Sequence, residues 1–148
     1  CHFVEVEIDP ATGTTEIASY CTVDDCGHVI NHDVVEAQVH GGVVQGVGQV
    51  LGEHVVYDRA TGQLLSGSFM DYTMPRAGML RGIRGQEHPT PSKVSPLGVK
   101  GVGESGCTGS LPALANAVMN ALRPLGVRHL DMPLTSSKVW HAINSAKS

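Results

Sequence analysis

The sequence predicts an α+β fold, a two-layer sandwich of β-hairpins and two main helices. Three patterns favour it. Apolar and polar residues alternate before an Asp-x-Ala-Thr-Gly turn that occurs twice, at 9–13 and 58–62, as in hairpins. Valines recur every three or four positions from 35 to 50, and a second apolar stripe lies at 114–122, as on helices. For 148 residues with 41% hydrophobic content, we expect a single domain over residues 1–148.

The first hairpin is expected over residues 2–23. On its first strand, residues 2–9, Val4, Val6 and Ile8 fall on one face and mostly acidic residues fall on the other, which is typical of a half-buried strand. In the turn that follows, proline fixes φ and glycine is free to take positive φ. Residues 14–23 are then the return strand, and a loop leads to residue 31.

The first helix is expected to run from a cap at Asn31 or Asp33 to about Gly52. Glycine is unusually frequent in it. Because each interior glycine costs about 1 kcal/mol relative to alanine, this helix is weak on its own and needs tertiary packing. Its glycines permit the close approach of either another backbone or a ligand. The sequence leaves both interpretations open.

The second hairpin is expected to pair residues 54–57 with residues 63–70 around the repeated turn. Residues 71–76 are predicted to be extended. The stretch 78–96 contains several prolines and is predicted to be a long loop, lying on the surface or beside a ligand.

The second helix is expected to be capped by Ser110, with Pro112 in its first turn and Gly126 just beyond its end. Its inward-facing residues are expected to be Leu114, Val118, Ala121 and Leu122. A short strand is predicted at 127–130. Residues 135–137 are predicted to cap a last helical turn, which holds Val139, Trp140 and Ile143.

Composition disfavours several classes of function. The net charge is −4 and no basic run occurs, which disfavours nucleic acid as a partner. No run of apolar residues reaches membrane-spanning length. The four cysteines lack zinc-site spacing and the eight histidines lack a metal-binding pattern, so we expect free thiols, no metal ligands from this chain and a cytoplasmic location. The chain opens without methionine inside a strand pattern, and we expect it to be a fragment or a processed piece.

The stretch 98–106 (GVKGVGESG) is the most distinctive in the chain. It formally contains the dinucleotide fingerprint G-x-G-x-x-G, but no βαβ unit surrounds it and no acidic residue follows about 20 positions on. Its one carboxylate is Glu104. Glycine amides can bind polar ligand atoms, and a partly desolvated glutamate can act as a general base. A catalytic thiol at Cys107, which has no identifiable histidine partner, is an alternative.

Five segments, in this order, resemble the molybdenum-binding large subunits of the xanthine dehydrogenase, aldehyde oxidase and carbon monoxide dehydrogenase family. They are residues 26–31 (CGHVIN), 38–49 (QVHGGVVQGVGQ), 67–75 (GSFMDYTMP), 98–104 (GVKGVGE) and 133–140 (PLTSSKVW). The likeness covers nearly the whole chain but only the C-terminal portion of a molybdenum cofactor-binding domain. Two positions depart from the family's usual residues: Ala37 stands for glycine and His32 for proline.

The resemblance implies that Glu104 is the general base beside the molybdenum centre and that Gln38 hydrogen-bonds the molybdopterin. By position, Lys100, Gly101, Val102 and Gly103 would line the same pocket. The subunit would oxidise an aldehyde, an N-heterocycle or carbon monoxide with water as the oxygen source, and purines also remain open as substrates. The residues 69–75 favour the cytosine dinucleotide form of the cofactor.

The resemblance also implies partners. These are the remainder of the large subunit, an iron–sulfur subunit and an FAD subunit, together with a small-molecule substrate. The isolated chain would be inactive. The alternative from another class is a non-catalytic structural or assembly module of such a complex.

Overall fold

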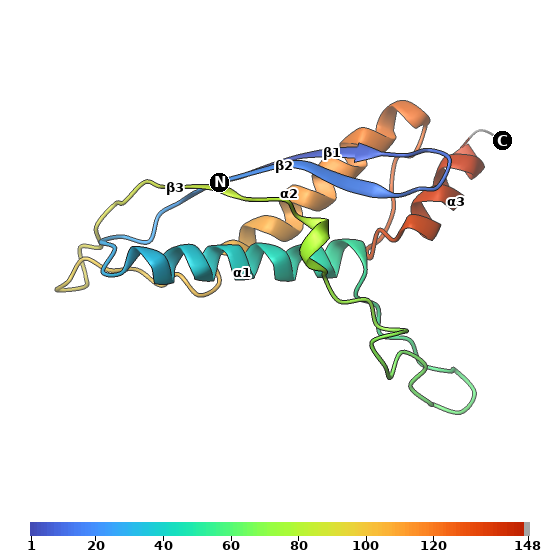
Figure 1. The fold of residues 1–148 in the computed structure, drawn as a ribbon, viewed down its shortest axis with the longest axis horizontal. Helices are drawn as coiled ribbons and strands as arrows, with labels where there is room; N and C mark the ends of the chain where they lie inside the picture. The colour runs from blue at the N-terminus through green and yellow to red at the C-terminus, as the bar shows by residue number, and fades with distance from the viewer. Residues whose placement is uncertain (147–148) are drawn as a thin grey trace.

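The computed structural model describes residues 1–146 and sets a three-stranded sheet against a pair of long helices (Figure 1). In chain order the elements are β1 His2–Ile8, β2 Thr15–Asp24, α1 His32–Leu51, η1 Ala77–Met79, β3 Arg84–Glu87, α2 Ser105–Leu122, η2 Arg123–Leu125 and α3 Ser136–Ala146. The predicted α+β class, with two main helices, is confirmed.

The first hairpin forms as predicted. β1 pairs with β2 antiparallel, from His2↔Thr22 to Ile8↔Thr15. The Asp9 carboxylate closes the turn by accepting hydrogen bonds from the Ala11 N–H at 2.9 Å and from the Thr12 hydroxyl at 2.7 Å. Local sequence alone therefore specifies this turn.

The third strand was missed by the sequence prediction, which assigned 78–96 to a loop. β3 pairs in parallel with β2, from Cys21↔Arg84 to Asp24↔Glu87. Its residues, Arg-Gly-Gln-Glu, carry no apolar alternation. This strand exists because the free edge of β2 offers hydrogen-bonding groups to any segment that passes along it.

Helix α1 begins as predicted. The side chain of Asn31 caps it by accepting a hydrogen bond from the Val34 N–H at 3.1 Å. Its apolar stripe is buried at Val35, Val39, Val43, Val47 and Val50. The stripe packs with Ile17 and Tyr20 of β2 and with the apolar faces of α2 and α3 in one core.

The glycines of α1 make room for another backbone. A Cβ placed on Gly42 would lie 2.7 Å from the Cys107 amide nitrogen on α2, and a Cβ on Gly46 would overlap the Ser110 hydroxyl. Reciprocally, a Cβ on Gly106 would overlap the Val39 carbonyl oxygen. The two helices therefore cross with their backbones in contact. Of the two interpretations left open by the sequence, helix packing accounts for Gly42 and Gly46.

The predicted start of the second helix was wrong. α2 begins at Ser105, immediately after Glu104, so Pro112 lies in its interior and not in its first turn. Ser110 is fully buried and its hydroxyl donates to the Cys107 carbonyl at 3.2 Å. Glycine and threonine have low helix propensity, but contact with α1 holds this first stretch helical. The predicted inward residues Leu114, Val118 and Leu122 are buried.

The second predicted hairpin does not join the sheet. Residues 54–76, called the arm below, extend away from the body (Figure 1). The turn at 58–62 forms, but the flanking segments pair only at one isolated bridge, Tyr57↔Leu64. A two-stranded ribbon without a third strand or an apolar partner is marginal. The predicted strand at 127–130 also does not form, because these residues pair with no strand in the part of the chain that is described.

The last helical element is longer than the predicted single turn. α3 spans 11 residues, and Thr135 caps it by accepting the Lys138 N–H at 3.4 Å. Val139 and Ile143 are buried, whereas Trp140 is 40% exposed. Within residues 1–146, no helix combines the length and the apolar character that a membrane crossing requires.

Candidate functional site

Glu104 lies at the rim of an open cleft of about 600 Å³ between the start of β1, the end of β2 and the start of α2. Its backbone occupies the N-cap position of α2, but its side chain makes no capping hydrogen bond. The residue is exposed. Both carboxylate oxygens are therefore available to a ligand or a proton.

Gln38 approaches the same place from α1. The residue is exposed on the first half of that helix. A Cβ placed on Gly103 would lie 3.8 Å from the Gln38 Oε1. The structure thus brings together Gln38 and the residue before Glu104.

Lys100 has a structural partner. Its ammonium donates to the Asp25 Oδ2 at 2.5 Å. This contact, together with hydrogen bonds from the Thr90 and Gly27 N–H groups, holds the pKa of the Asp25 carboxyl well below its usual range. The Lys100 side chain therefore fixes the loop, and it does not line the cleft.

The loop is also anchored through its backbone. The Lys100 N–H donates to the Cys26 carbonyl at 3.0 Å, and the His28 N–H donates to the Gly98 carbonyl at 2.9 Å. Gly27 and Gly98 have φ of 65° and 68°, a region that residues with a Cβ rarely adopt. The segment that carries Glu104 is therefore held to the end of β2.

The three residues after Lys100 differ from one another. Gly101 and Gly103 line the cleft, whereas Val102 is half-buried and packs against the core. The Val102 carbonyl accepts a hydrogen bond from the Ser105 N–H at 3.1 Å. Within residues 1–146, the N–H groups of Gly101, Val102 and Gly103 have no hydrogen-bond partner. Gly101 and Gly103 are also exposed, so they offer donors to a ligand.

The cleft is acidic. Asp24, Asp25 and Glu104 line it, and its described lining contains no lysine or arginine, although the Lys100 ammonium offsets the charge of Asp25. A region of this sign disfavours phosphate groups. In the described part of the chain, no group of three or more histidine, cysteine or acidic side chains is arranged to hold a metal ion. The thiol of Cys107 gains no support as a nucleophile, because none of the described histidines hydrogen-bonds it.

Sequence reasoning missed three residues of the cleft, His2, Asp24 and Asp25. Asp25, for example, contacts Thr90 and Lys100, which lie 65 and 75 residues further along the chain. The one available signal was the pair of adjacent aspartates directly after a strand, just before the Cys-Gly bend.

Comparison with known proteins then decides the family. The family described as molybdopterin cofactor-binding domain matches residues 1–80, more than half of the chain. The chain belongs to this family. The matched part contains Gln38, whereas Lys100 to Glu104 lie beyond it.

Named relatives of this chain of the molybdopterin cofactor-binding family are enzyme subunits. It is 41% identical to the carbon monoxide dehydrogenase large chain of Hydrogenophaga pseudoflava over 93% of its own length. It is 42% identical to the nicotine 6-hydroxylase large subunit of Paenarthrobacter nicotinovorans over 95% of its length. In both cases it spans only 17% of the relative.

Solved structures give the same result for the fold. The Cu,Mo-CO dehydrogenase superposes with a TM-score of 0.91 at 34% identity, over 96% of this chain and 18% of that chain. Quinoline 2-oxidoreductase from Pseudomonas putida 86 superposes with a TM-score of 0.90 at 38% identity, over 95% of this chain and 18% of that one.

The residues present fit the polar edge of a molybdopterin. A pterin carries both donors and acceptors. The N–H groups of Gly101 and Gly103 are free, and the Gln38 amide, which can donate and accept, lies near Gly103. The absence of side chains at these glycines allows a flat group to approach the backbone. The acidic cleft does not suit the cofactor's phosphate.

Proposed function

We propose that this chain forms one wall of the molybdenum cofactor site in the large subunit of a molybdenum hydroxylase. Such an enzyme oxidises an aldehyde, an N-heterocycle or carbon monoxide with water as the oxygen source. The observation that carries the proposal is the meeting of Gln38 and Gly103 beside Glu104 in a chain of the molybdopterin cofactor-binding family. The relatives named above are consistent with it.

The proposed roles follow from the groups available. The cofactor, when bound, supplies the redox chemistry of the reaction. Gln38 and the amides of Gly101 and Gly103 hydrogen-bond it and set its orientation, while Val102 and Lys100 support the loop. Glu104, with both oxygens free, accepts a proton as general base.

The form of the cofactor and the partners belong to the same proposal. We assign the cytosine dinucleotide form because of the resemblance of residues 69–75. Its phosphates would be held by residues outside this chain, because the lining of the cleft contains no described lysine or arginine. Electrons leave through iron–sulfur and FAD subunits or domains. The location is cytoplasmic.

The test is a Glu104→Gln substitution in the intact enzyme that contains this chain. The variant keeps the size of the side chain and one acceptor oxygen, but it replaces the other oxygen by an NH₂ donor and loses its basicity. We expect unchanged molybdenum and pterin content and a kcat lower by roughly three orders of magnitude or more, in line with the loss of a general base. Glu7→Gln, an exposed position on β1, is the matched control. A near-normal kcat in Glu104→Gln would show that another group is the base.

A second candidate is a non-catalytic assembly module. The exposed apolar side chains of the arm favour it, above all Phe69 at 78% and Met70 at 93% exposure, because such surface is normally covered by another chain or domain. Gel filtration with the remaining part of the subunit separates the two functions. A stable complex that holds cofactor but has no turnover favours the assembly module.

A further inference from the structure

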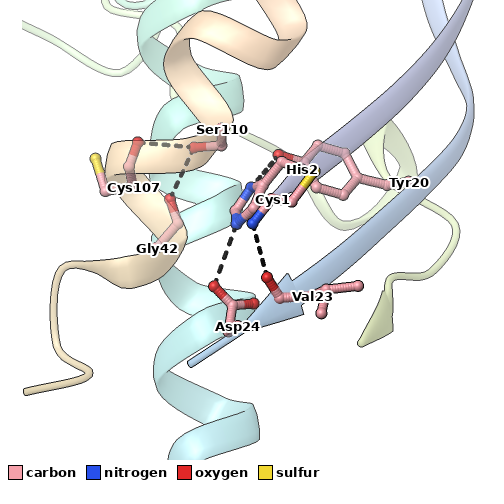
Figure 2. A network of polar contacts seen from close by, with 8 residues as sticks. All are labelled: Cys1, His2, Tyr20, Val23, Asp24, Gly42, Cys107 and Ser110. Carbon is pink, nitrogen blue, oxygen red and sulfur yellow. Dashed lines mark hydrogen bonds and ion pairs between the residues drawn. The ribbon is translucent and has the colours of Figure 1, made fainter. Parts of the chain in front are cut away.

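A buried polar network lies where the sheet faces the first turns of α2 (Figure 2). At its centre is His2, whose side chain is only 3% exposed although it borders the cleft. The His2 Nδ1 is 2.9 Å from the Tyr20 hydroxyl, and the His2 Nε2 is 3.5 Å from the Asp24 Oδ1. The two rings meet edge to face at 80°.

The protonation of this network follows from its partners. Burial raises the pKa of the Tyr20 phenol, so Tyr20 keeps its proton, and burial lowers the pKa of His2 in spite of Asp24. A carboxylate only accepts, so the hydrogen of a neutral His2 belongs on Nε2, facing Asp24. Tyr20 then donates to the free Nδ1. Tyr20 thereby orients the ring, whereas the His2 Nε2 faces Asp24 at 3.5 Å without a hydrogen bond.

His2 reaches α2 by direct packing. A Cβ placed on Gly109 would lie 2.6 Å from three atoms of the His2 ring, so the imidazole rests directly on the helix backbone. The next residue, Ser110, is fully buried. The Ser110 hydroxyl donates to the Cys107 carbonyl at 3.2 Å and lies 3.5 Å from the Gly42 carbonyl of α1.

These contacts hold the part of the helix from which Glu104 projects. The Glu104 carbonyl accepts a hydrogen bond from the Thr108 N–H at 3.0 Å, and Thr108 directly precedes Gly109. The start of α2 thus lies between the backbone of α1 on one side and His2 on the other. The contact between His2 and α2 is packing of the ring on the backbone at Gly109, which cannot pass on a proton. It therefore positions groups and does not conduct protons.

We propose that His2, held between Tyr20 and Asp24, is a positioning residue for Glu104. It fixes the first turns of α2, and with them the place of the carboxylate in the cleft. The role in turnover rests on the proposed function of Glu104, whereas the role in fixing α2 does not.

The test compares Tyr20→Phe with Tyr57→Phe in the intact enzyme. Tyr20→Phe removes only the hydroxyl that orients His2, and Tyr57 is a 60% exposed tyrosine of the arm. In Tyr20→Phe we expect amide hydrogen exchange of residues 105–110 to rise about tenfold while that of residues 114–122 is unchanged. Molybdenum content should be unchanged. We expect kcat to fall by about ten- to a hundredfold at nearly constant KM, since small displacements of catalytic groups have effects of this size. Tyr57→Phe should change none of these.

His2→Ala, with His129→Ala at an exposed position as its control, should show the same pattern more strongly. Wild-type exchange at 105–110 in Tyr20→Phe, or a fall in kcat without faster exchange, would overturn the proposal. The two proposals fail separately. A wild-type kcat in Glu104→Gln removes the base and leaves the exchange result standing, whereas wild-type exchange in Tyr20→Phe refutes the positioning whatever Glu104 does.

Discussion

The turns at 9–13 and 58–62 have the same residues at four of five positions and nearly the same geometry, yet they lie in very different surroundings. In each, the aspartate accepts hydrogen bonds from the alanine N–H and the threonine hydroxyl, and the glycine has φ of 73°. The first turn joins two strands of the core sheet. The second joins segments with a single bridge. Local sequence therefore specifies the turn, and tertiary contacts decide whether strands extend from it.

The two turns also differ in what surrounds their glycines, Gly13 and Gly62. A Cβ on Gly13 would lie 2.6 Å from the Trp140 amide nitrogen and would overlap the Ser136 carbonyl, so this turn packs against the start of α3. A Cβ on Gly62 would have nothing within 4 Å. One turn is part of the core assembly and the other stands in the open.

The sharpest way to test this contrast is to truncate one leucine in each region. Leu114 is fully buried in α2, whereas Leu65 in the arm is 52% exposed. We expect Leu114→Ala to lower the free energy of unfolding by about 2–5 kcal/mol and Leu65→Ala to change it by less than about 0.5 kcal/mol. Urea unfolding of the chain, followed by circular dichroism, measures both. Equal losses would mean that the arm is packed in solution.

The two turn glycines give the next largest effect. Alanine at either position meets the same strain at positive φ, about 1 kcal/mol. Only Gly13→Ala also meets the backbone of α3, which should add about 1–3 kcal/mol. Urea midpoints of Gly13→Ala and Gly62→Ala give the comparison. If the two variants unfold at the same denaturant concentration, the contact between the first turn and α3 has no energetic weight.

The smallest effect is a pH dependence of the folding stability, which we expect to arise from His2 in the body and not from the arm. Burial lowers the pKa of His2 from its ordinary 6.5, against the opposing influence of Asp24. Just below pH 6.5 the unfolded chain binds a proton at this histidine and the folded chain does not. The folded state therefore loses stability as pH falls from 6.5 to the lower, folded-state pKa, and has this contribution in full above 6.5.

His2→Gln should flatten the dependence of stability on pH in that window, and His54→Gln, at an exposed position in the arm, should leave it unchanged. Unfolding midpoints between pH 7 and pH 5 measure it. The aspartates of the two turns do not contribute to the pH dependence in this window, because hydrogen bonds from Thr12 and Thr61 lower their pKa values from 3.8. If the unfolding midpoint of His2→Gln still falls between pH 7 and pH 5 as in the wild type, another titrating group causes the pH dependence.

Prediction from sequence succeeded where the controlling interactions are local. The hairpin of β1 and β2 and the Asn31 cap of α1 follow from alternation, turn chemistry and capping. β3 and the first turns of α2 depend on a sheet edge and on a facing helix, which no local pattern records. The arm shows the converse, since a hairpin pattern without a partner surface gives only one bridge.

The candidate site divides in the same way. Gln38 and Glu104 were identified by resemblance, and the structure brings their neighbourhood together through Gly103. Lys100 was expected in the pocket, but its side chain binds Asp25 and holds the loop in place. The sequence did not reveal this contact, because Asp25 is 75 residues away. His2 carried no signal at all, because its importance comes from three elements that meet around it.

The crossing of α1 and α2 also sets a mechanical ratio. The contact includes Gly42 and Gly46 of α1, so its centre lies six residues from Gln38 and seven residues from Leu51, where α1 leads into the arm. With a rise of 1.5 Å per residue, these lever lengths are about 9 Å and about 10.5 Å. If the helix pivots at this centre, a 10° swing moves the arm end by about 1.8 Å and Gln38 by about 1.6 Å in the opposite direction. In such a pivot, α1 acts as a nearly balanced lever that carries a displacement of the arm to the pocket wall at almost its full size.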